Sequence, residues 1–217
     1  MVSTKALCYQ DRKTPRLLEL APDEHPAAVQ IFGHEPETIV VPARGGLGDK
    51  MELQANTIAT VLAGRLKTRY LQLYVPDSVS EDVLQKILEE DARVKQVVET
   101  IKSADILVHG MGQARVMAEK RGMDPKLVER LEQAGAVGEA LGQYFDLKGH
   151  VVYSTDTLGL MVNDLEKIHT VMGIAGGRSK GRAILSMLRS GQDDILVTDE
   201  AAAREIIDCL QSDPNNQ

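Results

Sequence analysis

The chain of 217 residues is poor in aromatic side chains and in cysteine. It has no Trp and only two Phe, so stacking on nucleic-acid bases is not an expected activity. Its cysteines, Cys8 and Cys209, stand near opposite ends without metal-ligand spacing, which fits a reducing compartment. The five histidines are scattered and no two of them have ligand spacing. We therefore expect neither a metal site nor another cofactor.

The sequence also lacks long apolar runs and an excess of basic residues. No stretch approaches the roughly 20 apolar residues that span a bilayer, and the first residues do not open a signal peptide. We expect a cytoplasmic protein with no membrane partner. A net charge of −7 argues against a broad nucleic-acid-binding face. With 43% hydrophobic and 26% charged residues, the composition is that of an ordinary globular protein.

Short apolar runs alternate with helical patterns along most of the chain. Strands are predicted at residues 28–32, 38–41, 70–75, 106–109, 150–153, 170–175 and 195–198. Helices are predicted at residues 49–67, 80–102, 112–121, 125–133, 179–190 and 200–210. This alternation is typical of a doubly wound α/β fold, Rossmann-like, with a mostly parallel sheet. In such sheets ligands bind beyond the carboxyl ends of the strands.

Two predicted strands end in glycine-rich corners that carry a cation. The first is ARGGLG (43–48), with Arg44, and the second is GGRSK (176–180), with Lys180. Glycines let backbone N–H groups approach a ligand, and the N-terminus of the following helix favours an anion. Neither string is a Walker loop or a dinucleotide fingerprint. Glycine-rich turns also occur in such folds for structural reasons alone, but two cationic corners in one sheet suit a ligand with phosphate groups.

Four further residues are candidates, each with a simpler explanation. Lys120 and Arg121 either reach a phosphate or complement the C-terminal end of a helix dipole. Glu139 is a lone acid among small residues, which either caps a helix or binds sugar hydroxyls. Gln54 falls within the helix after the first corner, where polar residues usually face solvent. No nucleophile motif appears, so we expect no catalytic residue and no enzyme.

Several strings together, in order and spacing, resemble the effector-binding domain of SorC-type sugar-binding transcriptional regulators. They are VPARGGLG (41–48), QANTI (54–58), TIKSA (100–104), LVHG (107–110), AGG (175–177), SK (179–180) and LVTDE (196–200). The likeness runs from about residue 38 to 210. It implies a fold similar to ribose-phosphate isomerase and glucosamine-phosphate deaminase, with a phosphorylated sugar such as fructose 1,6-bisphosphate as effector rather than substrate. It also implies that the effector loosens a repressor's hold on operator DNA, and that the domain forms a homo-oligomer.

The resemblance assigns roles to the candidate residues. Arg44 and Gln54 would bind the sugar phosphate at the first corner, and Lys180 a phosphate at the last. Lys120 and Arg121 would also reach a phosphate, while Glu139 would bind sugar hydroxyls. The family usually has Arg-Arg where this chain has Lys120 and Arg121, so the first position offers a point charge instead of a fork.

The sequence departs from the family before residue 38. The family's first strand, its Gly-Gly-Thr-Thr-like loop and its first helix have no match, and no helix-turn-helix precedes the domain. We therefore expect an effector domain at 38–217, which binds DNA only through a segment that this chain does not contain. Residues 1–37 instead resemble a fragment of a tRNA-dihydrouridine synthase, through MVSTKAL (1–7) and HPAAVQIFG (25–33). The catalytic region of that enzyme is absent, so flavin binding and tRNA reduction are not expected.

The short connection between residues 28–32 and 38–41 limits how these strands can pair. A parallel crossover needs about a dozen residues or more, whereas this link has five. Residues 28–32 therefore cannot be the parallel neighbour of the strand before Arg44. Two other functions stay open: a sugar-phosphate isomerase or deaminase with Glu139 or Asp199 as base, and a remnant that has lost ligand binding.

Overall fold

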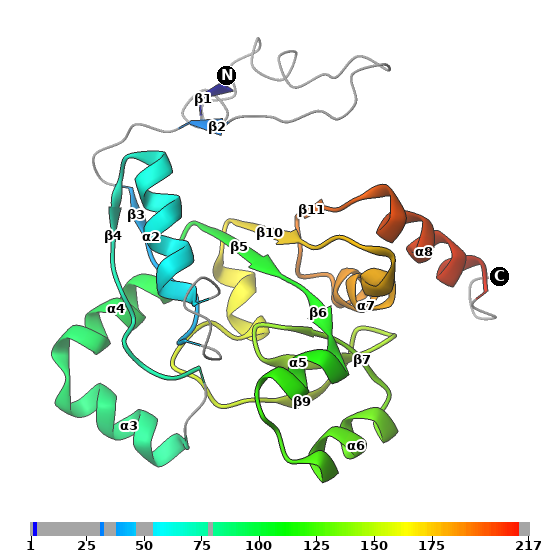
Figure 1. Cartoon of the computed structure of the whole chain (residues 1–217). Helices are drawn as coiled ribbons and strands as arrows, with labels where there is room; N and C mark the ends of the chain where they lie inside the picture. Colours follow the sequence, from blue (N-terminus) through cyan, green and yellow to red (C-terminus); the bar gives the residue numbers. More distant parts are fainter. Residues whose placement is uncertain (1, 4–30, 33–37, 47–53, 78–79, 213–217) are drawn as a thin grey trace.

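The computed structural model describes residues 2–3, 31–32, 38–46, 54–77 and 80–212. Its strands are β1 (Val2–Ser3), β2 (Ile31–Phe32), β3 (Ile39–Val40), β4 (Arg69–Tyr70), β5 (Ile106–Gly110), β6 (Gly112–Gln113), β7 (Ala136–Ala140), β8 (Gln143–Asp146), β9 (Val151–Ser154), β10 (Thr170–Ile174) and β11 (Ile195–Val197). Its helices are α2 (Ala55–Leu66), α3 (Glu81–Glu90), α4 (Ala92–Lys102), α5 (Ala114–Lys120), α6 (Pro125–Gln133), α7 (Gly181–Ser190) and α8 (Glu200–Gln211), with 3-10 turns η3 (Val162–Lys167) and η4 (Arg178–Lys180). Figure 1 shows their arrangement.

Parallel strands separated by helices form the framework of the fold. Strands β11, β10 and β5 make a three-stranded parallel sheet, and β3 pairs with β4 in a second parallel ladder. Helix α2 connects β3 to β4, and α7 connects β10 to β11. The predicted α/β class with parallel strands is confirmed. Strand β2 pairs with β1 and is not hydrogen-bonded to β3, in agreement with the limit set by the short connection.

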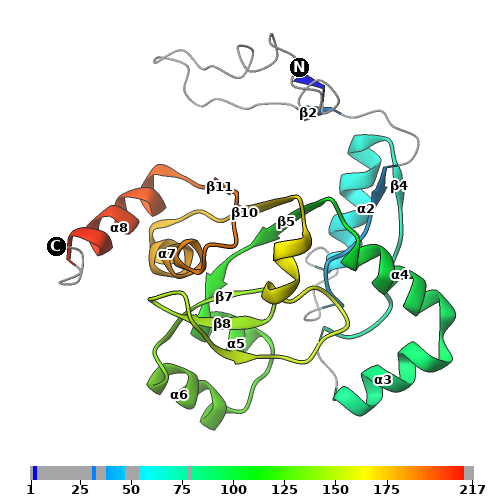
Figure 2. The ribbon, with the colours of Figure 1, turned by 180° about the vertical axis from the view of Figure 1, so that it is seen from behind.

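A four-stranded antiparallel sheet, in the order β6, β7, β8, β9, was not predicted. Residues 150–153 were expected in the parallel sheet, but they lie in β9 and pair antiparallel with β8. The hairpin from β7 to β8 turns at Leu141 and Gly142, whose φ values are 51° and 74°. Positive φ at both positions defines a type I′ turn, whose twist suits a two-residue hairpin. In Figure 2, β7 and β8 run side by side next to α5.

The helix predicted for residues 80–102 is two helices in the structure. Its break falls at Asp91, whose carboxylate accepts hydrogen bonds from the backbone N–H groups of Arg93 and Val94. Asp91 is therefore the N-cap of α4, a role that favours a new helix over a continuous one. Among the described residues, no helix is both long and apolar enough to cross a membrane.

The parallel sheet buries one face and exposes the other. Alternate residues Leu107, His109 and Val171 are buried and belong to the inner face. Their neighbours on the other face are exposed large apolar residues: Ile106, Val108, Ile174, Ile195 and Val197. Parallel sheets are normally covered on both faces.

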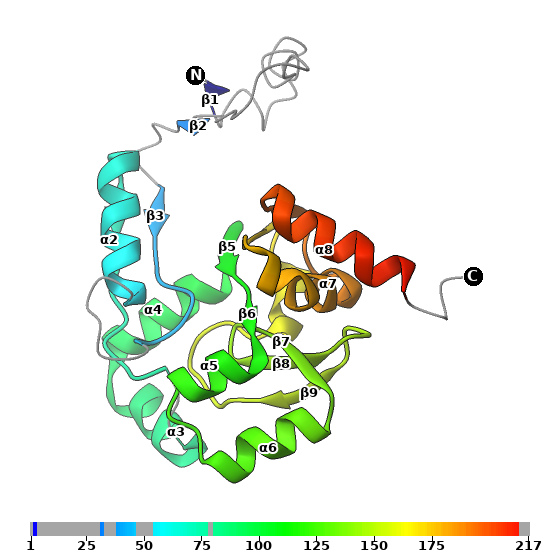
Figure 3. The same ribbon diagram turned by 45° about the vertical axis from the view of Figure 1, so that its right-hand side comes forward.

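In the part of the chain that the structure describes, β3 pairs on one side only, and so does β5. Figure 3 shows β3 and α2 on one side of β5, with α7 and α8 on the other.

Candidate functional site

The glycine corner after β3 is held tightly against the segment that follows β4. Gly46 donates its N–H to the carbonyl of Val75 at 3.1 Å, and Asp77 donates its N–H to the carbonyl of Gly46 at 2.9 Å. A β-carbon on Gly45 would overlap the backbone of Val75 and Pro76. Only glycine permits this approach, so the sequence of the corner fixes where Arg44 leaves the backbone.

Arg44 is buried and uses most of its N–H groups inside the protein. Its Nε donates to Asp77 Oδ1 at 2.7 Å, and its Nη2 donates to Thr155 Oγ1 at 3.0 Å and to the carbonyl of Asp77 at 3.3 Å. Its Nη1 donates to the carbonyl of Leu141. The side chain of Arg44 is 8% exposed. This arginine is therefore part of the framework of the site as well as a candidate ligand for an anion.

Arg121 shares the carboxylate of Asp77 with Arg44. Its Nε lies 3.0 Å from Asp77 Oδ2, and its Nη2 lies 3.0 Å from Glu139 Oε1. Burial works against the charge of Arg121, but Glu139 and Asp77 outweigh it and raise the pKa of the guanidinium. Nη1 of Arg121 lies 3.5 Å from the hydroxyl of Tyr144, and burial raises the pKa of that phenol. We call Arg44, Asp77, Arg121 and Glu139 the arginine cluster.

The type I′ turn between β7 and β8 contributes backbone groups to the arginine cluster. Gly142 donates its N–H to Glu139 Oε1 at 2.7 Å, and its carbonyl accepts from both the N–H and the hydroxyl of Thr155. Leu141 offers its carbonyl to Arg44 from a left-handed conformation. A non-glycine residue in that conformation costs roughly 1–3 kcal/mol and persists where the surroundings determine it. Here the surroundings are Arg44 and Thr155.

The second glycine corner presents Lys180 in a different setting. Gly177, with φ 95°, donates its N–H to Asp199 Oδ2 at 2.6 Å, which fixes the corner against the start of α8. Gln113 of β6 donates from Nε2 to the carbonyl of Ser179 at 2.5 Å. Lys180 is partly exposed, and within residues 38–46, 54–77 and 80–212 its side chain makes no hydrogen bond or ion pair. We call residues 176–180 the lysine corner.

Strand β6 links the lysine corner to the arginine cluster. Gly112 is the register partner of Glu139, and the next residue, Gln113, reaches Ser179. Space at Gly112 is limited, because a β-carbon there would overlap the side chain of Met117 and lie 3.8 Å from Glu139 Oε2. Strand β6 is therefore adjacent both to Glu139 of the arginine cluster and to the lysine corner.

The structure brings together some of the residues predicted from the sequence and separates others. Arg44, Arg121 and Glu139 meet in the arginine cluster. Gln54 precedes α2 and lies beside Gly46, because a β-carbon on Gly46 would overlap Gln54 Oε1. Lys120 is the last residue of α5 and is exposed, whereas its neighbour Arg121 is in the buried cluster. Glu139 lies on β7, so the interpretation of this residue as a helix cap is wrong.

Three residues of the site were missed by the sequence interpretation. Asp77 joins the two arginines, Thr155 binds Arg44, and Tyr144 approaches Arg121. The signal for Asp77 was its position, since it follows the apolar run at residues 70–75 with only Pro76 between them. Polar residues at strand ends are candidates for a ligand site in this fold class. Thr155 and Tyr144 left no comparable signal, because they belong to the antiparallel hairpins.

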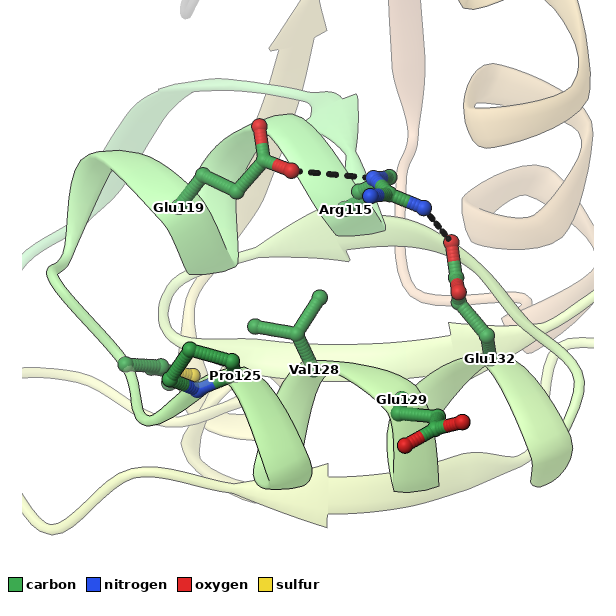
Figure 4. Close-up of a pocket in the computed structure, with 7 residues that line it drawn as sticks. Arg115, Glu119, Pro125, Val128, Glu129 and Glu132 are labelled. Atoms are coloured by element: carbon green, nitrogen blue, oxygen red, sulfur yellow. Dashed lines mark hydrogen bonds and ion pairs between the residues drawn. The ribbon is translucent and has the colours of Figure 1, made fainter.

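A cleft of about 400 Å³ lies elsewhere, between α5 and α6 (Figure 4). Its walls include Arg115, which lies 2.9 Å from Glu119 and 2.8 Å from Glu132. This arginine is 62% exposed and already paired. The cleft therefore has a neutralised cation at its rim and offers less to an anion than the lysine corner does. Within the described ranges, no group of three or more His, Cys, Asp or Glu side chains could hold a metal ion.

Known proteins resemble this chain over most of its length. A family model described as a "putative sugar-binding domain" matches residues 28–208. The chain is 41% identical over 172 residues to the central glycolytic genes regulator of Priestia megaterium, which covers 79% of this chain and 50% of that protein. Its identity to the protein of the same name from Bacillus subtilis is 39% over 171 residues, with the same two coverages.

Among solved structures, the "putative SorC family transcriptional regulator from Enterococcus faecalis" matches with a TM-score of 0.71 and 36% identity. That match covers 82% of this chain and 69% of the other. The chain spans about half the length of the two relatives from Priestia and Bacillus. None of these matches supports the resemblance of residues 1–37 to a tRNA-dihydrouridine synthase, and the family model begins inside that segment.

Proposed function

The chain belongs to the sugar-binding domain family of SorC-type transcriptional regulators, and on that premise we propose that it binds a phosphorylated sugar as a regulatory effector. Among phosphorylated sugars, we propose fructose 1,6-bisphosphate as the effector. The observation that carries the proposal is the meeting of Arg44, Arg121 and Glu139, which are far apart in the sequence, in one buried cluster beside a corner that presents Lys180.

Each part of this site suits one part of such a ligand. Guanidinium forks bind phosphate oxygens with good geometry, and a lysine at the start of a helix adds a point charge. Lys180 directly precedes α7, so an anion there would meet both the ammonium group and the first N–H groups of the helix. A sugar with phosphates at both ends would use the arginine cluster and the lysine corner together.

Glu139 is suited to the hydroxyl groups between the phosphates. Both of its described contacts, from Arg121 and from the N–H of Gly142, go to Oε1. Oε2 is left to accept hydrogen bonds from a sugar. An acid in this place would favour ligands with neutral hydroxyl donors, such as a sugar, over inorganic phosphate, whose negative charge the carboxylate repels.

Regulation of transcription is proposed for the longer protein type that these relatives represent. We propose that residues 38–217 carry the effector-binding unit and that operator DNA is bound by a different segment. The effector would then loosen the longer protein's hold on operator DNA. The names of the two relatives support glycolytic genes as the target of this regulation.

The thermal midpoint of the purified chain, measured against a panel of phosphorylated sugars, tests the proposal. A ligand that binds only the folded state stabilises it by about 2.7 kcal/mol at a hundredfold excess over Kd. We expect an upward shift with fructose 1,6-bisphosphate and a smaller one with inorganic phosphate. If the chain unfolds cooperatively and no phosphosugar at millimolar concentration raises the thermal midpoint, the chain folds but has no effector site.

Product analysis separates the regulator from an enzyme on the same fold. Both carboxylates that could act as a base already accept hydrogen bonds: Glu139 from Arg121 and Gly142, and Asp199 from Gly177 and Ala202. We expect hexose phosphates to be recovered unchanged after prolonged incubation. If the chain turns over a hexose phosphate steadily, and Glu139→Gln or Asp199→Asn abolishes this turnover, then the chain is an isomerase or deaminase and the proposed regulatory function is wrong.

A further inference from the structure

The carboxylate of Asp77 takes the place between two guanidinium groups that an anionic ligand would want. Its Oδ1 lies 2.7 Å from Arg44 Nε, and its Oδ2 lies 3.0 Å from Arg121 Nε. Carboxylate and phosphate are the two anions that arginine forks match best, because both present oxygen pairs at similar spacing. The two arginines are therefore arranged around a pair of oxygens, and Asp77 supplies that pair.

The charges of the arginine cluster determine whether a phosphate can bind beside Asp77. The arginine cluster contains two guanidinium groups and two carboxylates, so its formal charges cancel. All four side chains are between 5% and 8% exposed, so water screens them little. A phosphate group carries about −1.5 to −2 charges at neutral pH. Adding it to a neutral, buried cluster would leave about 1.5 to 2 uncompensated negative charges, and displacement of one carboxylate would reduce that costly excess by one.

Asp77 is the carboxylate that can leave. Glu139 is bound by a backbone N–H from the type I′ turn as well as by Arg121. The described contacts of the Asp77 carboxylate are with the two arginines alone, while its backbone is fastened to Gly46. Rotation of this side chain would break only its ion pairs with the two arginines, while the backbone hydrogen bonds keep the corner in place.

We propose that Asp77 is an internal counter-anion, which holds Arg44 and Arg121 together in the unliganded protein and is displaced when a phosphate of the effector binds between them. This inference rests on the proposed function. It makes Asp77 a determinant of effector affinity that acts against binding. The unliganded site is kept neutral and folded, and the effector must compete with a group of the protein itself.

The affinity of Asp77→Asn for fructose 1,6-bisphosphate, measured by calorimetry on the full chain, tests this inference. Asparagine keeps the size of the side chain and its carbonyl oxygen but removes the charge. We expect Kd to fall about tenfold or more relative to the unsubstituted chain, and the affinity for inorganic phosphate to rise as well. Asp77→Glu, which keeps the charge, should bind no more tightly than the unsubstituted chain.

The control variant is Glu129→Gln, which removes one negative charge from the exposed surface of α6. Its Kd should stay within about twofold of the unsubstituted value, since screening by water weakens its effect. If Asp77→Asn binds equally or more weakly while the unsubstituted chain binds well, Asp77 only positions the arginines and the inference is overturned. If neither chain binds a phosphosugar, the proposed function fails with it.

A crystal structure of the unsubstituted chain with fructose 1,6-bisphosphate gives a test that does not depend on the folding of a variant. The inference requires both carboxylate oxygens of Asp77 to lie more than about 4 Å from the two Nε atoms, with phosphate oxygens in their place. A bound effector alongside an unmoved Asp77, still at hydrogen-bond distance from Arg44 and Arg121, would overturn it.

Discussion

The arginine cluster and the lysine corner hold their cations in opposite ways. Arg44 and Arg121 are buried and paired with carboxylates, whereas Lys180 is partly exposed and without a described partner. A charge removed from water needs a counter-charge, but a charge at the surface does not. Removing a group from the arginine cluster should therefore affect the fold and the ligand together, whereas removing Lys180 should affect the ligand alone.

The largest effect is expected for Arg121→Met. The change would leave Glu139 and one oxygen of Asp77 buried without their cation, and breaking a buried pair in this way costs roughly 3–5 kcal/mol. Urea denaturation should show a decrease of that size in the free energy of unfolding. Arg115→Met is the matched control, because Arg115 also contacts two carboxylates but is 62% exposed. Arg115→Met should lose far less stability than Arg121→Met, because water screens exposed ion pairs, and equal losses in the two variants would contradict the comparison.

Arg44→Ala should weaken binding of the effector by about 1.5–3 kcal/mol, or roughly tenfold to a hundredfold. Arg44 also binds Thr155 and the turn at Leu141, so the melting temperature should fall in the same variant. Calorimetry at a temperature where circular dichroism shows a folded chain separates the two effects. An unchanged affinity would remove Arg44 from the ligand site and leave it a structural residue.

Lys180→Ala should reduce affinity about tenfold while the free energy of unfolding changes by no more than about 0.5 kcal/mol. The side chain makes no described contact, so its removal leaves no buried group unpaired. Lys120, at the C-terminal end of α5, provides the control: Lys120→Ala should change the affinity less than about threefold. If Lys120 proved the more important of the two, the phosphate would have to lie toward α5.

The smallest effect is expected outside both regions, at Asp146. Burial works against its charge, but hydrogen bonds from His150 and Lys148 outweigh it and lower the pKa of the carboxyl group. A depressed folded pKa stabilises the protein above the unfolded pKa, near 3.9, and this stabilisation is lost as pH falls through the folded value. The free energy of unfolding of Asp146→Asn should therefore fall less steeply below about pH 4 than that of the unsubstituted chain. If the free energies of unfolding of the two proteins fall in parallel with pH, Asp146 makes no contribution to the pH dependence of stability.

Apolar runs and helix periods predicted three strands of the parallel part of the fold, whereas the strand predicted at residues 70–75 is a strand only at Arg69–Tyr70. Strands β5, β10 and β11 are short and nearly continuous in apolar residues, and the helices that connect them show a clear period. The antiparallel sheet escaped prediction because its central hairpin is rich in glycine and turns at Leu141, a residue that rarely takes a positive φ. Local patterns cannot reveal a turn that tertiary contacts impose.

The candidate site was predictable only in part, for a related reason. Arg44 and Lys180 were marked by the glycines around them, and Arg121 and Glu139 by the resemblance to a family. Asp77 was marked only by its place after an apolar run, because its role depends on where the chain after β4 returns to the corner after β3. Two residues that meet only through tertiary structure have no fixed spacing in the sequence, so the pairing of Asp77 with Arg44 and Arg121 could not be predicted.

Calorimetric titration of the full chain with fructose 1,6-bisphosphate, repeated for Lys180→Ala, tests the central claim most directly. The account predicts saturable binding at one site per chain, which Lys180→Ala weakens about tenfold without lowering the melting temperature. No saturable binding at millimolar ligand by a chain that unfolds cooperatively would contradict it.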